Sequence, residues 1–136
     1  MIDSDLWSLK MGRVLSTASF LRSCDVLDIS FSNGDVWEVY VVMTQEQRSR
    51  GLSDVAFLDL DGMLFCYSAP SYVPFTMKDM AIDLDIAWYD YRGSLLRKSS
   101  FAAGFPDPIW GPGGFFYVLE AAAGTIPESD LEVSYG

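Results

Sequence analysis

The sequence predicts an α+β fold that is mainly β: a small antiparallel sheet or a partly open barrel, with one short helix after the first hairpin. Two observations lead to this prediction. Short segments rich in β-branched and aromatic residues recur along the chain, about 8–12 residues apart and separated by turn residues. Only one segment carries clear signals for both the start and the end of a helix. The length of 136 residues fits a single domain.

The strongest local signal is a hairpin. Asp25–Phe31 partly alternates apolar and polar residues, and Val36–Val42 is rich in β-branched and aromatic residues. Asn33 and Gly34 lie between these two segments. Asn and Gly tolerate the positive φ angles that a type I′ or related turn requires, so we expect a tight connection between antiparallel strands.

The helix signal follows this hairpin directly. Thr44 and Gln47 have the spacing of a capping box, in which the two side chains satisfy each other's backbone N–H groups. Gly51 is the expected end of the helix, because glycine tolerates the left-handed conformation that follows many helices. Arg48 and Arg50 fall in the last turn, where cations suit the negative end of the helix dipole.

The remaining sequence predicts further strands and one long loop. The expected strands are Gly62–Tyr67, Phe75–Met77, Ile82–Tyr89, Ser94–Lys98 and Phe115–Ala121. The loop Phe101–Gly114 contains three prolines and is long for a compact domain. Residues 1–24 predict an N-terminal arm or edge element, and residues 25–136 form the predicted single domain.

The composition excludes several classes of partner. The chain carries 19 acidic and 9 basic residues, which gives a formal net charge of −10 at pH 7. Such a charge repels phosphate backbones and anionic lipids, so we expect neither nucleic-acid nor membrane binding. No apolar segment approaches the roughly 18 residues of a membrane helix. Asp3 and Asp5 are atypical of a signal peptide, so we expect an unprocessed chain.

The chain has no histidine and only two cysteines, Cys24 and Cys66. Without histidine, Ser-His and Cys-His mechanisms are excluded. The cysteines are too few for a disulfide framework and too far apart for a CxxC motif. Two buried reduced thiols are expected, although a single bridge between them stays open. The sequence also lacks a phosphate-cradling glycine loop, so it predicts no cofactor and no catalytic residue.

Five motifs occur in an order that resembles one bacterial family. They are Thr44–Leu52, Gly62-Met63-Leu64-Phe65, Phe75-Thr76-Met77-Lys78-Asp79, Leu84-Asp85-Ile86 and Tyr117-Val118-Leu119-Glu120. Together they are similar to the signatures of the domain of unknown function family 192, and the resemblance covers roughly residues 36–124. It implies a small β-rich domain, with no enzyme activity established across the family. Many bacterial members carry a secretion signal, and relatives also occur in phage genomes.

The sequence departs from the family's pattern at four positions. Thr76 stands where the family has Trp, Asp79 where it has Asn, Met80 where it has Thr, and Asp83 where it has Pro. A polar pocket built around these positions would therefore be altered. The acidic N-terminus also departs from the secreted members, so we expect a cytoplasmic or virion location.

Four charged residues lie within or beside otherwise apolar strand segments: Lys78, Asp79, Asp85 and Glu120. Charges are rarely buried unless they are paired. The first interpretation is a structural ion pair, in which Lys78 meets Asp85 or Glu120 and fixes the register of the strands. The second is a small polar pocket that binds a ligand.

Aspartates gather in two places without completing a metal site. Asp79, Asp83, Asp85 and Asp90 suggest a site for a hard cation, and Asp59-Leu60-Asp61-Gly62 imitates the start of a calcium loop. That loop lacks the third ligand and the terminal Glu. Solvated surface aspartates explain both clusters more simply, so we expect no metal.

The long loop supplies the candidates for contact with a partner. Trp110 and Phe105 lie among its glycines and prolines, and large aromatic side chains dominate interface energetics. Trp110 either forms an exposed platform or folds back over the end of the barrel. We expect a non-catalytic binding or assembly module that contacts a protein partner or a second copy of itself, such as a phage virion or phage-encoded accessory protein. The alternative is a small-ligand-binding or periplasmic accessory domain with a weak enzymatic role.

Overall fold

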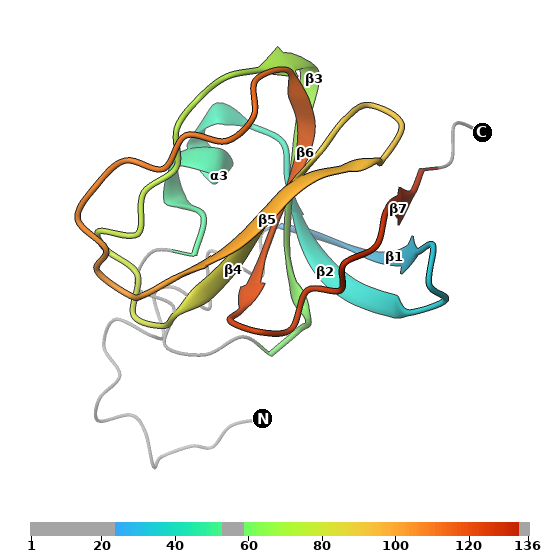
Figure 1. The fold of residues 1–136 in the computed structure, drawn as a ribbon, viewed down its shortest axis with the longest axis horizontal. Helices are drawn as coiled ribbons and strands as arrows, with labels where there is room; N and C mark the ends of the chain where they lie inside the picture. Colours follow the sequence, from blue (N-terminus) through green and yellow to red (C-terminus); the bar gives the residue numbers. More distant parts are fainter. Residues whose placement is uncertain (1–23, 53–58, 134–136) are drawn as a thin grey trace.

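The structure is a computed structural model that describes residues 24–52 and 59–133 (Figure 1). Within these ranges the chain forms seven strands and one short helix, which confirms the predicted mainly β class. The elements are β1 (Asp25–Phe31), β2 (Val36–Val42), α3 (Gln45–Arg50), β3 (Gly62–Ser71), β4 (Leu84–Tyr89), β5 (Leu95–Phe101), β6 (Phe115–Ala122) and β7 (Leu131–Glu132). The predicted N-terminal arm lies outside the described residues, apart from Cys24.

The strands form one curled sheet in the order β5-β4-β6-β3-β2-β1-β7, which makes a partly open barrel (Figure 1). Most neighbouring strands are antiparallel, as predicted, but β2 and β3 are parallel, with Val39 opposite Gly62 and Val42 opposite Phe65. Parallel neighbours require a crossover connection. Here the crossover contains α3, so the helix and the parallel pair are two consequences of one connection.

The first hairpin is confirmed, and of the type I′ or related turns that were expected it has a three-residue form. The amide of Phe31 donates to the carbonyl of Asp35 (2.8 Å) and the amide of Gly34 donates to the carbonyl of Phe31 (2.9 Å). The connection therefore has three residues, Ser32, Asn33 and Gly34. Gly34 has a φ of 98°, as expected for the residue that ends a three-residue hairpin loop.

Helix α3 begins and ends where the sequence predicts. Thr44 accepts a hydrogen bond from the amide of Gln47 (3.0 Å), and the Gln47 side chain accepts one from the amide of Thr44 (3.2 Å). Gly51 ends the helix with a φ of 45°. Its amide donates to the carbonyl of Gln47. A helix this short is held mainly by its caps and by its packing on the sheet.

Removing the N-cap should weaken this helix measurably. Thr44→Ala is expected to lower the free energy of unfolding by about 1 kcal/mol, because the Gln47 amide loses its acceptor. The measurement is urea unfolding followed by tryptophan fluorescence. A denaturation midpoint equal to that of the wild type would contradict the assignment.

Several of the later strands differ from their predictions in bounds or existence. β3 runs four residues past its predicted end, from Tyr67 to Ser71, with an irregular register between Cys66 and Ser71. Phe75–Met77 is not a strand: Phe75 forms only an isolated bridge with Ile109. The two-residue strand β7 was not predicted from the sequence, because two residues carry no periodicity.

The two faces of the sheet carry separate apolar cores. One core contains Met63, Phe65, Ile86 and Val118, and it is covered by α3 and by residues from the loops after β3 and β5. The other contains alternate residues of the same strands, and it is covered by the segment that leads to β7. Its members include Val39, Leu64, Ala87, Leu119, Ile126 and Leu131. Side chains alternate between the faces along a strand, so neighbouring residues belong to different environments.

Candidate functional site

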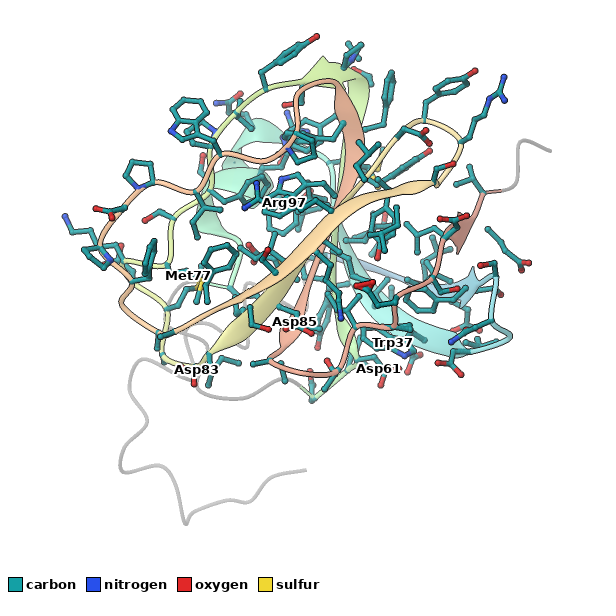
Figure 2. All side chains as sticks on the ribbon, viewed as in Figure 1. Trp37, Asp61, Met77, Asp83, Asp85 and Arg97 are labelled. Carbon is teal, nitrogen blue, oxygen red and sulfur yellow. The ribbon has the colours of Figure 1, made fainter. Side chains whose placement is uncertain are left out.

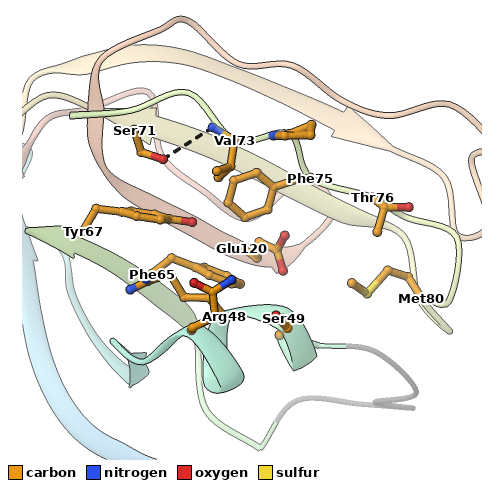
Figure 3. A pocket seen from close by; sticks show the side chains of 13 residues that line it. Arg48, Ser49, Phe65, Tyr67, Ser71, Val73, Phe75, Thr76, Met80 and Glu120 are labelled. Atoms are coloured by element: carbon orange, nitrogen blue, oxygen red, sulfur yellow. Dashed lines mark hydrogen bonds between the residues drawn. The ribbon is translucent and has the colours of Figure 1, made fainter. Parts of the chain in front are cut away.

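A pocket with a volume of about 440 Å³ opens on the face of the sheet that α3 covers (Figure 3). Its walls come from α3, from β3, from the loop that follows β3, and from β6. The lining residues are Gln45, Arg48, Ser49, Gly51, Phe65, Tyr67, Ser71, Val73, Pro74, Phe75, Thr76, Met80 and Glu120. This volume lies within the range of small-molecule sites, which are mostly apolar with a few convergent polar groups.

Glu120 is the polar group set deepest in this pocket. Its side chain is only 1% exposed, and Figure 3 shows its carboxyl beside Phe65 and Phe75. Among the described residues, Oε1 of Glu120 has no hydrogen-bond partner. Burial raises the pKa of this carboxyl to about 8, because the charged form loses its hydration. Glu120 is therefore mainly a neutral acid near pH 7.

Aromatic rings form most of the pocket wall around Glu120. The rings of Phe65 and Phe75 meet edge to face with their centroids 5.2 Å apart. Tyr67 meets Phe115 in the same manner at 5.5 Å. Edge-to-face pairs are favourable beyond simple burial, so these walls are well packed rather than loosely collapsed.

Arg48 supplies the fixed positive charge of the pocket. Its Nη1 donates to the carbonyl of Cys66 (3.1 Å) and to the carbonyl of Met43. Its guanidinium also lies 4.6 Å from the centre of the Tyr67 ring, a cation–π geometry. Arg48 thus ties α3 to β3 while its remaining donors stay at the pocket wall. The pKa of Tyr67 rises to about 12, chiefly through burial, so its hydroxyl keeps its proton.

Two departures from the family's motifs line this pocket, Thr76 and Met80. The other two, Asp79 and Asp83, lie outside its lining and are exposed. A threonine in place of the family's tryptophan leaves more space at the rim. The structure therefore places two of the four departures at the pocket and two away from it.

The predicted ion pair of Lys78 is wrong. Lys78 is exposed and forms no salt bridge with any described residue. Asp79 is exposed beside it. The two proposed partners lie on opposite faces of the sheet, because Glu120 stands opposite Ile86 and Asp85 stands opposite Ala121. One lysine could not have served both positions.

Asp85, which lies on β4 (Figure 2), instead holds the segment that leads to β7. Its carboxylate accepts hydrogen bonds from the Ser100 hydroxyl (2.5 Å) and from the amide of Ile126 (3.1 Å). Burial alone would raise the pKa of Asp85. Hydrogen bonds from Gly124, Ser100 and Ile126, with the charge of Lys98, outweigh burial and lower it. Asp85 is therefore a structural carboxylate rather than part of the pocket.

The two aromatic candidates of the long loop have different environments. Phe105 is half-buried and packs against the core, with its ring 5.8 Å from that of Phe101. Trp110 is 61% exposed, so it forms a platform and does not fold back. Its backbone is nevertheless held, because Nη1 of Arg97 donates to the Trp110 carbonyl (3.2 Å).

The next residue explains why the loop can approach the sheet so closely. A Cβ atom on Gly111 would lie 2.1 Å from Nε1 of Trp88, so only glycine fits there. The guanidinium of Arg97 lies 5.3 Å from the centre of the same Trp88 ring. The loop therefore packs on the sheet through Gly111, while Trp110 points into solvent.

The remaining sequence predictions concern thiols, metals and membranes. Neither Cys24 nor Cys66 forms a disulfide bond, and burial raises the pKa of the Cys66 thiol to about 11. Cys24 is buried as predicted, whereas Cys66 is only half-buried. In the part of the chain that the structure describes, no three Cys, Asp or Glu side chains are placed to bind a metal ion. No helix in that part is long and apolar enough to cross a membrane.

The sequence identified Glu120 as a candidate ligand-binding residue, but it did not identify the other residues that line the pocket. Arg48 was interpreted only as a cation favoured by the helix dipole, although its spacing from Thr44 places it one turn into α3. Phe65 and Tyr67 alternate along β3 and therefore share a face with Glu120 once the strands pair. That alternation was the available signal, but it needed the register of β3 against β6.

Two solved structures share this fold. One, from Sinorhizobium meliloti, is described as a candidate transcription regulator; it is 24% identical, with a TM-score of 0.67, over 77% of this chain and 89% of that chain. The other, a protein of unknown function from Novosphingobium aromaticivorans, is 22% identical, with a TM-score of 0.68, over 81% of this chain and 85% of that chain. At these identities the likeness shows the fold alone. No curated protein matches the chain.

The family assignment comes from the sequence match. The model of the family DUF192, described as Uncharacterized ACR, matches residues 28–135. This range contains all five motifs of the sequence analysis and every described residue that lines the pocket. The chain belongs to the DUF192 family.

Proposed function

We propose that this domain is a binding module that holds a small ligand in the pocket between α3, β3 and β6. The observation that carries this proposal is the Glu120 carboxyl, which is 1% exposed and faces the pocket with Oε1 unpartnered. A buried polar atom without a partner costs roughly 1–3 kcal/mol. A ligand that donates a hydrogen bond to Glu120 would recover that cost.

Binding fits the side chains around the pocket better than covalent catalysis does. The chain contains no histidine to serve as a general base. The Cys66 thiol, with its pKa raised to about 11, is almost entirely protonated near pH 7 and is a poor nucleophile. The hydroxyl of Ser100 donates to Asp85 on the other side of the sheet. The pocket thus offers recognition groups without an activated nucleophile.

The proposal is tested by a screen of small fragments that contains acids, amines and neutral compounds. Binding is read from amide chemical shifts in NMR spectra of the wild type, of Thr76→Trp and of Trp110→Ala. Thr76→Trp narrows the rim, whereas Trp110 does not line the pocket. Bound fragments should shift the amide signals of α3 and β3. Thr76→Trp should weaken the binding of these fragments, whereas Trp110→Ala should leave their binding unchanged. A screen without any hit at the pocket would contradict the proposal.

A second candidate function is contact with a partner protein or a second copy of the chain through Trp110. The observation that favours it is the 61% exposure of this side chain on a loop whose backbone is fixed by Arg97. A rigid aromatic anchor loses little entropy when it is buried at an interface. This role would use a different surface from the pocket, so both functions could operate in one domain.

Replacing Trp110 with Ala should weaken association with a partner without changing the stability of the fold. Trp110→Ala is expected to leave the free energy of unfolding nearly unchanged, because the side chain is exposed. It should weaken association by at least about 2 kcal/mol, the range of an interface hot spot. Light scattering over a concentration series measures self-association of the wild type and of Trp110→Ala. A wild type that stays monomeric and binds no partner would contradict this second function.

A further inference from the structure

The chemistry of the pocket also points to a class of ligand, an inference that rests on the proposed function. We infer that the pocket takes a small primary amine, whose ammonium group pairs with the carboxylate of Glu120 between the aromatic walls. The unpartnered Oε1 of Glu120 is an acceptor for an N–H donor. Phe65 and Phe75 lie beside this carboxyl, and the faces of aromatic rings attract cations (Figure 3).

The charged groups around Glu120 do not supply its counter-ion. The other titratable side chains among the described lining residues are Arg48 and Tyr67. Among the described residues, Arg48 forms no salt bridge with Glu120, and burial raises the pKa of the Glu120 carboxyl. Ile86, which stands opposite Glu120 on β4, is apolar. The site for a cation beside Glu120 is therefore unfilled by any described side chain.

An anionic ligand is the competing chemistry, because Arg48 also lines the pocket. Arg48 already has partners within the protein: its Nη1 donates to two backbone carbonyls, and its guanidinium stacks on the Tyr67 ring. The chain as a whole carries a net charge of −10, which attracts cations and repels anions at long range. Both arguments favour the amine.

Amine binding must be linked to a proton. Near pH 7 the free amine is an ammonium ion and Glu120 is mainly a carboxylic acid, so forming the ion pair releases the Glu120 proton to the solvent. The ammonium then donates to the carboxylate, and no covalent bond changes. Because only the ionised form of Glu120 pairs with the ligand, the affinity should rise about tenfold per pH unit below the pKa of Glu120 and level off above it.

The test compares three probes that share one ring: phenethylamine, phenethyl alcohol and phenylacetate. Their affinities are measured by NMR titration at about pH 6, 7 and 8, and proton release is measured by calorimetry in buffers of different ionisation enthalpy. Phenethylamine should bind at least tenfold more tightly than the other two near pH 8. It should release about one proton per molecule bound near pH 6.

Two substitutions separate a local pair from general charge attraction. Glu120→Gln should lower the phenethylamine affinity at least tenfold near pH 8 and remove its pH dependence. Glu46→Gln changes the net charge equally at an exposed position of α3 that does not line the pocket, and it should leave the affinity unchanged within about twofold.

The outcomes distinguish the inference from the proposed function. Tighter binding of phenylacetate or phenethyl alcohol at the pocket would overturn the amine inference and leave the binding module standing. Equal loss of phenethylamine binding in Glu46→Gln and Glu120→Gln would also overturn the inference, because it would indicate long-range attraction only. Absence of binding by all three probes, together with an empty fragment screen, would overturn the proposed function itself.

Discussion

Replacing Glu120 with Gln should raise the free energy of unfolding at about pH 9 by up to roughly 5 kcal/mol. Burial raises the pKa of Glu120 from 4.5 to about 8, and each unit of difference between folded and unfolded states corresponds to about 1.4 kcal/mol. The contribution of this group to stability is fully present below about pH 4.5 and is lost as the pH rises through about 8. Glutamine keeps the shape of the neutral acid but cannot ionise.

This prediction is checked by urea unfolding of both proteins at about pH 5, 7 and 9. The difference between them should be less than about 1 kcal/mol at the lowest pH and should grow steadily towards the highest. Glu46→Gln serves as the matched control, because Glu46 is exposed and its substitution makes the same change in net charge. Parallel pH profiles of the wild type and Glu120→Gln would show that Glu120 ionises as readily in the folded protein as in the unfolded chain.

Replacing Asp85 with Asn should lower the free energy of unfolding by about 3 kcal/mol. The carboxylate accepts from the Ser100 hydroxyl (2.5 Å) and from the Ile126 amide (3.1 Å), and hydrogen bonds to a charged acceptor are the strong class. The amide group of Asn brings a donor towards other donors. The Ile126 and Leu131 amides should therefore exchange with solvent faster, because the segment leading to β7 loses its anchor.

The contribution of Asp85 to the free energy of unfolding depends on pH with the opposite sign to the contribution of Glu120. The pKa of Asp85 lies below its ordinary value of 3.8, so the stabilisation is present above that pH and is lost as the pH falls through the lower folded value. Asp83→Asn is the matched control: Asp83 is exposed, and its carboxylate accepts one hydrogen bond from the described residues, from the Ala103 amide (2.8 Å). Equal effects of the two substitutions would contradict the anchoring role of Asp85.

The local signals in the sequence predicted their elements well. The hairpin strands β1 and β2 and the caps of α3 depend on neighbouring residues, such as Thr44 with Gln47, whose interactions are set by short spacing. The parallel pairing of β2 with β3 depends on a crossover, and nothing within either strand encodes its direction. The sequence also left the form of the turn at Asn33 and Gly34 open, because the pairing of Phe31 with Asp35 sets the loop length.

The pocket was only partly predictable for a related reason. A charge inside an apolar strand identified Glu120 as unusual, but its environment depends on the register of β6 against β4. In that register Ile86 stands opposite Glu120, which places Asp85 on the other face. A shift of one residue would have exchanged the two faces, and alternation along one strand cannot reveal such a shift. Lys78 follows the predicted strand Phe75–Met77, which the structure does not contain, and its exposed side chain makes the predicted pairing wrong.

The most direct test of the account is the titration of the Glu120 side-chain carboxyl by carbon NMR, without and with saturating phenethylamine. The account predicts a pKa of about 8 in the free protein, because burial without a counter-charge disfavours the carboxylate. The pKa of Glu120 should fall by at least one unit when the ammonium group pairs with it. A ligand that binds the ionised carboxylate ten times more tightly than the neutral acid produces a shift of that size. A pKa close to 4.5 in the free protein, unmoved by the amine, would contradict the central claim that Glu120 is the buried recognition group of a ligand pocket.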